Sequence, residues 1–148
     1  MVSNIIGQKR HEEVIPLVWR ISKISFLISL VIVILLNMAP EIILGVYQQG
    51  DGFIADAIPV VRIVSVALLL MSFSTAWLNA VTGTGNTVVN LTIEAITIVL
   101  YCLYVHMVLV HWYLPITWGW GSEIVYWVSM FSMAFWYMKY GNWRAKVI

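Results

Sequence analysis

The residues in this chain that could best bind an ion or carry a proton are polar side chains within a long apolar stretch. Asn90, Glu94, Thr97, Tyr101 and Tyr104 are spaced four, three, four and three residues apart, which places them on one face of an α-helix. The Glu94 carboxylate could carry a proton or hold a cation, and the other groups could line a polar cavity. The competing interpretation is that the whole face only bonds and packs against neighbouring helices.

A shorter polar stripe precedes this one and has the same helical spacing. It comprises Ser65, Ser72, Thr75 and Asn79. Small and hydroxylated side chains let helices approach closely and form hydrogen bonds between them, so packing is again the competing interpretation. The candidate ion-coupling or cavity-lining residues from both stripes are therefore Glu94, Asn90, Thr97, Tyr101, Ser72 and Asn79.

Enzyme, cofactor and metal signatures are missing from the sequence. The Gly-Thr stretch around Gly83 lacks the Lys of a phosphate-binding loop. The single cysteine, Cys102, excludes a disulfide within the chain and a paired-cysteine redox motif. His106 and His111 are five residues apart and do not share a face of an α-helix. We therefore expect no enzyme, no cofactor and no metal site.

The elements that must position the polar residues are helices in a membrane. The chain of 148 residues is 61% hydrophobic and 10% charged, whereas soluble domains are about a quarter charged. This apolar composition indicates that a lipid bilayer surrounds the chain. The net charge of +1 gives no basic surface that would attract nucleic acid. Four apolar segments have lengths suited to crossing the hydrocarbon core as helices, and they lie at about residues 22–38, 57–81, 88–112 and 122–138. The fold class is thus all-α integral membrane, with two antiparallel hairpins.

Basic residues at both ends of this region predict its orientation. Lys9, Arg10 and Arg20 precede the first segment and Lys23 lies at its start, whereas Lys139, Arg144 and Lys146 follow the fourth segment. Since such residues favour the cytoplasmic side, we expect both termini to be cytoplasmic, in the plasma (bacterial inner) membrane. Residues 1–21 are then a cytoplasmic segment with an amphipathic linker, residues 22–140 the membrane region and residues 141–148 a cytoplasmic tail.

The junction between the second and third segments has the composition of a tight turn. Residues 82–87 read TGTGNT, and we expect this turn to face the cytoplasm. Gly83 and Gly85 can adopt positive φ there, and Asn86 or Thr87 can cap the helix that follows.

Two motifs resemble segments of a known transporter family, and they occur along the chain in the same order as in that family. The run LNAVTGTGNTVVNLTIE, residues 78–94, is similar to the segment that joins the tenth and eleventh helices of multidrug and toxic compound extrusion (MATE) transporters. VSNIIGQKRHEE, residues 2–13, resembles the signature at the cytoplasmic end of their eighth helix. The resemblance implies that the chain is the last four helices of a second six-helix lobe. It also implies that residues 1–21 include the end of a preceding helix.

The resemblance also implies a function. MATE transporters are antiporters that export organic cations or xenobiotics in exchange for H⁺ or Na⁺, so a small cationic molecule is the expected substrate. We expect this chain to be a carboxyl-terminal fragment, inactive until it joins the missing amino-terminal helices or another chain. Sodium-coupled members often carry an acid in the tenth helix, but Val64–Asn79 contains none.

Two alternatives remain, a small four-helix membrane subunit and a dimeric small multidrug transporter. The dimeric kind carries an essential Glu in its first helix, whereas residues 22–38 contain no acid.

Overall fold

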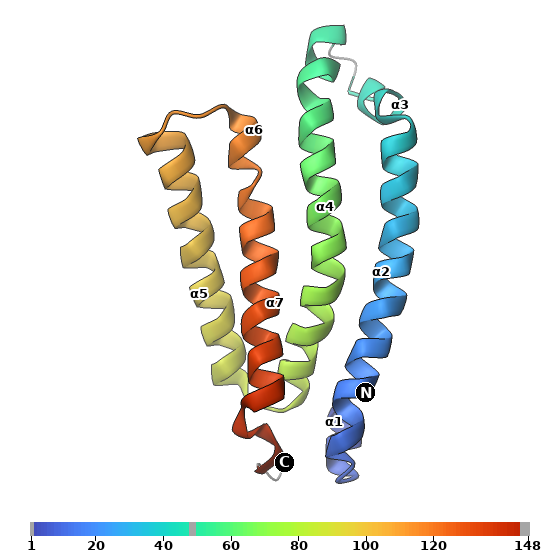
Figure 1. Ribbon diagram of the computed structural model, residues 1–148, viewed down its shortest axis with the longest axis vertical. Coiled ribbons are helices and arrows are strands. Elements are labelled where there is room, and N and C mark those ends of the chain that lie inside the picture. The colour runs from blue at the N-terminus through green and yellow to red at the C-terminus, as the bar shows by residue number, and fades with distance from the viewer. Residues whose placement is uncertain (1, 48–49, 146–148) are drawn as a thin grey trace.

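Helices make up the folded part of this chain in the computed structural model, which describes residues 2–47 and 50–145 (Figure 1). Four of the helices are long: α2 (Val14–Met38), α4 (Gly50–Gly83), α5 (Thr87–Val105) and α7 (Ser122–Tyr140). Short helical pieces precede, connect or follow them, namely α1 (Val2–Gly7), η1 (His11–Glu13), α3 (Pro40–Gly45), η2 (His106–His111), α6 (Ile116–Gly119) and η3 (Asn142–Ala145). No strand occurs in the described ranges.

Three helical stretches of the described chain are long and apolar enough to cross a membrane. They are His11–Met38, Gly52–Gly83 and Thr87–His111. The fourth expected crossing, α7, is 19 residues long but does not reach the same hydropathy. It carries serines and several Trp and Tyr residues, which are polar at one end and suit a membrane interface or a protein contact.

The long helices do not pack in chain order. α4 packs extensively against both α2 and α7, and α5 packs mainly against α7. α4 and α5 make few contacts with each other and converge at the turn that joins them (Figure 1). The resulting order across the bundle is α2, α4, α7, α5.

The hydrophobic core gathers toward the end of the bundle that contains the α4–α5 turn. The Trp77 side chain is fully buried there, and its ring centroid lies 5.4 Å from that of Trp19 and 4.9 Å from that of Phe135, both in edge-on geometry. Such contacts between aromatic rings add about 0.5–1.5 kcal/mol per pair beyond the area that they bury. This aromatic cluster ties α2, α4 and α7 together.

The amphipathic linker expected before residue 22 is the first part of α2. The helix begins at Val14, so Pro16 lies in its first turn, where no backbone hydrogen bond is lost. Val14 and Val18 are buried in the protein core. The apolar face of this segment therefore packs against protein rather than lying on a membrane surface. The first long helix begins at Val14 instead of near residue 22.

An exposed ion pair marks the connection between α1 and α2. The Arg10 guanidinium donates from Nε to Glu13 Oε1 at 2.7 Å, and its NH2 group donates to Glu13 Oε2 at 2.6 Å. These hydrogen bonds, and the carboxylate charge, hold the pKa of Arg10 above its ordinary value. Because both side chains are exposed, the pair contributes little to stability.

A turn forms where it was expected, but only residues 84–86 lie between the helices, because α4 ends at Gly83 and α5 begins at Thr87. Gly85 has φ of +73°, a conformation that glycine adopts without strain. The Asn86 side chain accepts a hydrogen bond from the Val89 backbone N–H at 3.4 Å and so caps α5. Gly83, by contrast, is the last residue of α4, and its conformation is not among the positive-φ ones.

Candidate functional site

The polar stripe of α5 faces the protein. Thr97 is fully buried, and Asn90, Glu94, Tyr101 and Tyr104 are partly buried. On the opposite side of the same helix, Leu91 is 68% exposed and Ile98 is 52% exposed. The spacing in the sequence therefore identified the inward face of this helix, because an α-helix repeats every 3.6 residues whatever it packs against.

A chain of hydrogen bonds leads from the α4–α5 turn to Glu94. The Thr82 hydroxyl lies 2.8 Å from Asn90 Oδ1, and Asn90 Nδ2 donates to Glu94 Oε1 at 2.8 Å. The bond at Thr82 is exposed, whereas the bond at Glu94 is partly buried. These three side chains thus form a polar path from the surface of the turn into the membrane-length part of α5.

Glu94 has no cationic partner in the described parts of the chain. The salt bridge that the structure shows there joins Arg10 and Glu13, and Glu94 is hydrogen-bonded to Asn90. A carboxylate within a membrane helix is costly unless a proton, a cation or hydrogen bonds compensate its charge. In the described chain, the neutral amide of Asn90 supplies a hydrogen bond to Glu94. Any further compensation of the charge would come from a proton or a cation.

Further along α5, the stripe makes contacts of three kinds. The Thr97 hydroxyl donates to the Ile93 carbonyl at 2.8 Å within its own helix. Tyr101 meets Tyr126 of α7 edge-on, with ring centroids 6.1 Å apart. Tyr104 donates from its hydroxyl to the Trp118 carbonyl at 3.1 Å. The stripe therefore bonds its own helix, packs on α7 and reaches the short helix α6 in turn.

Tyr104 also lines a cavity at the α6 end of the bundle. The cavity has a volume of about 560 Å³ and is bordered by Ile63 of α4, Tyr104 of α5, Trp118 of α6 and the start of α7. Its walls are mostly apolar, and two of the residues are aromatic. Such a lining suits a flat apolar molecule, and aromatic faces also attract cations.

Ser72 and Asn79 are not brought to Glu94. The buried Ser72 hydroxyl donates to the Leu69 carbonyl of its own helix at 2.7 Å. Asn79 is exposed, and no hydrogen bond joins it or Ser72 to Asn90 or Glu94 in the described ranges. The reason is the packing order, since α7 lies between α4 and α5 beyond their turn.

Two other serines of α4 form hydrogen bonds to neighbouring helices. The Ser74 hydroxyl is buried and lies 2.6 Å from the Trp127 carbonyl of α7. Asn37 of α2 donates from Nδ2 to Ser65 Oγ at 2.7 Å. Ser65 belongs to the stripe identified in the sequence, whereas Ser74 lies outside its spacing, so packing alone reveals Ser74.

Thr82 is the member of the polar path that the sequence interpretation missed. We assigned it to the turn, but the structure places it within α4. It follows Asn79 by three residues and so continues the stripe of Ser72, Thr75 and Asn79. That spacing was the available signal.

We expected His106 and His111 to point to different sides because we assumed an α-helix there, and that assumption was wrong. Residues 106–111 form a π-helix, in which hydrogen bonds join residues five apart, so these histidines are about one turn apart. Both are exposed. In the described ranges, no group of three or more His, Cys, Asp and Glu side chains could hold a metal ion.

Long apolar helices with an inward polar face place this chain among the helical membrane proteins. A family model described as MatE matches residues 1–109. The chain therefore belongs to the MATE transporter family, as its two motifs suggested. No curated protein and no solved structure matches the chain in the corresponding comparisons.

Proposed function

We propose that this chain forms the carboxyl-terminal part of a MATE-type antiporter, in which Glu94 couples ion entry to export of an organic cation or other xenobiotic. The coupling ion is H⁺ or Na⁺. The observation that carries the proposal is the polar path Thr82–Asn90–Glu94, which ends at a partly buried carboxylate without a cationic partner in the described chain.

The Asn90 amide lets this path accommodate Glu94 in two protonation states. With Nδ2 toward Glu94, the amide donates to an ionised carboxylate. With the amide reversed, its oxygen would accept from a protonated Glu94 and its nitrogen would donate to Thr82, because the hydroxyl both donates and accepts. For Na⁺, the same three side chains supply the oxygen atoms that hard cations prefer. One set of residues can therefore serve either ion.

The cavity beside Tyr104 supports an aromatic or cationic substrate. It lies on the same inward face of α5 as Glu94, ten residues further along the helix, or about 15 Å at 1.5 Å per residue. A cation held there would lie above the plane of aromatic rings in an apolar space. Ion binding at Glu94 would then act on the substrate through movement of α5 rather than by direct contact.

The proposal includes four crossings, with α7 as the last, and cytoplasmic termini. α7 packs between α4 and α5, so protein covers much of its surface and less of it needs to be apolar. Transport by alternating access requires one repeat to move against another around a central site. We therefore propose that these helices export substrate only together with the amino-terminal helices of the transporter or with another chain.

A dye-export assay in a drug-sensitive bacterial strain tests the proposal. The chain would be expressed alone and together with a separately expressed amino-terminal part of a family member that contains its first eight helices, and export of a fluorescent organic cation would be followed. We expect export only from the combination. Glu94→Gln should abolish its dependence on the ion gradient, whereas Glu41→Gln, an exposed carboxylate in α3, should leave it unchanged.

The alternatives predict different outcomes in the same assay. Resistance or export from the chain alone would contradict the fragment proposal and favour a dimeric small transporter. Gradient-driven export that survives Glu94→Gln would remove Glu94 from the coupling step. A four-helix subunit without transport activity would give no export with these eight amino-terminal helices but would co-purify with another membrane protein.

A further inference from the structure

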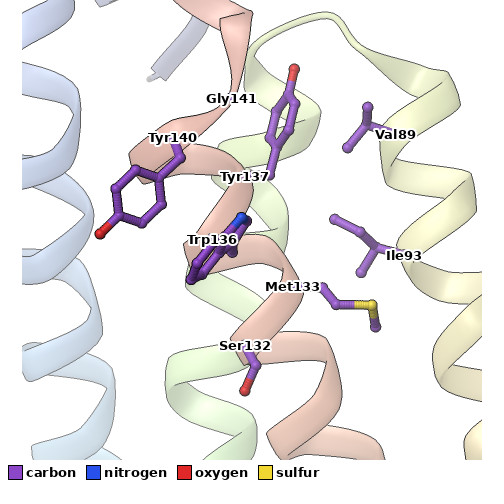
Figure 2. Close-up of a pocket in the computed structure, with 8 residues that line it drawn as sticks. All are labelled: Val89, Ile93, Ser132, Met133, Trp136, Tyr137, Tyr140 and Gly141. Carbon is purple, nitrogen blue, oxygen red and sulfur yellow. The ribbon is translucent and has the colours of Figure 1, made fainter.

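An apolar groove runs along the outside of the bundle between α5 and α7, at the end that contains the α4–α5 turn (Figure 2). Its volume is about 490 Å³. Val89 and Ile93 of α5 form one wall, and the other wall comes from α7 and the residue after it: Ser132, Met133, Trp136, Tyr137, Tyr140 and Gly141. The α5 wall of the groove borders the inward polar stripe, because Ile93 is buried in the core and precedes Thr97 by one helical turn. On the α7 wall, Ser132, Trp136 and Tyr140 are exposed.

The length of the groove matches one leaflet of a membrane. From Ser132 to Gly141, the α7 wall advances nine residue steps along the helix axis, or about 14 Å at 1.5 Å per step. The hydrocarbon core of a bilayer is about 30 Å thick. An acyl chain of a single leaflet could therefore lie along the whole groove.

Polar groups gather at the end of the groove near the turn. The Tyr137 hydroxyl accepts a hydrogen bond from Asn86 Nδ2 at 3.0 Å, which leaves its own proton free to donate. Lys139 Nζ lies 5.1 Å from the ring centroid of Tyr140, one of the lining residues. No salt bridge engages Lys139 in the ranges that the structure describes. The groove therefore has a hydroxyl donor at one end, and a cation lies outside its lining, beside Tyr140 and Phe135.

We propose that this groove binds an anionic phospholipid of the leaflet at the α4–α5 turn. The acyl chain lies between Ile93 and Met133, and the phosphate accepts a hydrogen bond from Tyr137. Lys139 contributes a positive charge beside Tyr140, near the same end of the groove. Trp136 and Tyr140 contact the region between the acyl chains and the headgroup, where such side chains are favoured. Basic pockets between membrane helices at the cytoplasmic side bind anionic headgroups by this same chemistry.

The inference depends on the proposed membrane crossing of α7 but not on transport or on Glu94. Lipid binding can therefore succeed or fail independently of the export assay.

Native mass spectrometry of the 148-residue chain, released from nanodiscs, tests this site. Nanodiscs would contain equal amounts of phosphatidylglycerol and phosphatidylcholine, which have similar acyl chains and differ in headgroup charge. We expect phosphatidylglycerol to be retained preferentially. Lys139→Gln should reduce that preference about fivefold, since one basic residue near an anionic surface contributes about that factor. Tyr137→Phe should reduce it by a smaller factor.

Two matched variants complete the experiment. Lys23→Gln removes an exposed basic residue of α2 that lies outside the groove, and it should leave lipid preference unchanged. Ile93→Trp fills the groove and should lower retention of both lipids, with circular dichroism verifying the helical content. Equal retention of the two lipids by the unmodified chain, or an equal loss of preference in Lys23→Gln and Lys139→Gln, would overturn the proposal.

Discussion

Gly83, at the end of α4, is in direct contact with Val2 of α1. A Cβ added at Gly83 would lie 2.8 Å from both Cβ and Cγ1 of Val2, closer than side chains can approach. Val2 and Ile6 are part of the hydrophobic core. The α4–α5 turn therefore supports α1 through a close approach that only glycine permits, which links the first described segment to the base of the polar path.

We predict that Gly83→Ala destabilises the protein despite the better helix propensity of Ala. Overpacking typically costs about 1–3 kcal/mol, and the gain in helix propensity is about 1 kcal/mol. The net loss should lower the melting temperature in detergent by a few degrees, at about 2–4 °C per kcal/mol.

Gly52→Ala is the matched control for this change, because Gly52 is also in α4 but has nothing within 4 Å of an added Cβ. It should be neutral or stabilising. In a Val2→Gly background, Gly83→Ala should lose its cost. A Gly83→Ala protein as stable as Gly52→Ala would show that the contact with Val2 is unimportant.

The Thr82–Asn90 hydrogen bond should be measurable as a coupling energy between α4 and α5. A double-mutant cycle with Thr82→Val and Asn90→Leu should give about 0.6 kcal/mol, the average for polar pairs in membrane proteins, and at most about 1.7 kcal/mol. Unfolding by denaturant in mixed micelles provides the free energies. Thr92→Val is the control, because the hydrogen bond of the Thr92 hydroxyl within the described residues is to the Val88 carbonyl of its own helix. Coupling between Thr92 and Asn90 as large as that of Thr82 would contradict the assigned path.

The proposed orientation can be tested with cysteine labelling, since Cys102 is the only cysteine in the sequence. In a Cys102→Ser background, Gln8→Cys and Asn142→Cys should react with a membrane-impermeant maleimide only after cells are opened. Tyr113→Cys should react in intact cells. All three positions are exposed in the structure. Labelling of Gln8→Cys and Asn142→Cys from opposite sides would mean an odd number of crossings and would exclude α7 as the fourth.

Local periodicity explains why part of the site was predictable. Asn90, Glu94 and Thr97 share a face in any α-helix, and the outward residues Leu91 and Ile98 show which face turns inward. Asn86 was identified as a possible cap from its residue type and its place before an apolar run. These inferences needed only neighbours in the chain.

The sequence by itself determined that this is an all-helical membrane protein of the MATE family, and it identified the inward face of α5. Apolar length and helical spacing are properties of consecutive residues, so they can be read without the fold. Only the tertiary structure decided that α7 separates α4 from α5. The tertiary structure also joined Thr82 to Asn90 beside the turn, left Ser72 and Asn79 without a hydrogen bond to Glu94 in the described ranges, and buried Ser74 against Trp127. These outcomes depend on which helices pack together across the chain, and small differences in close packing decide that order.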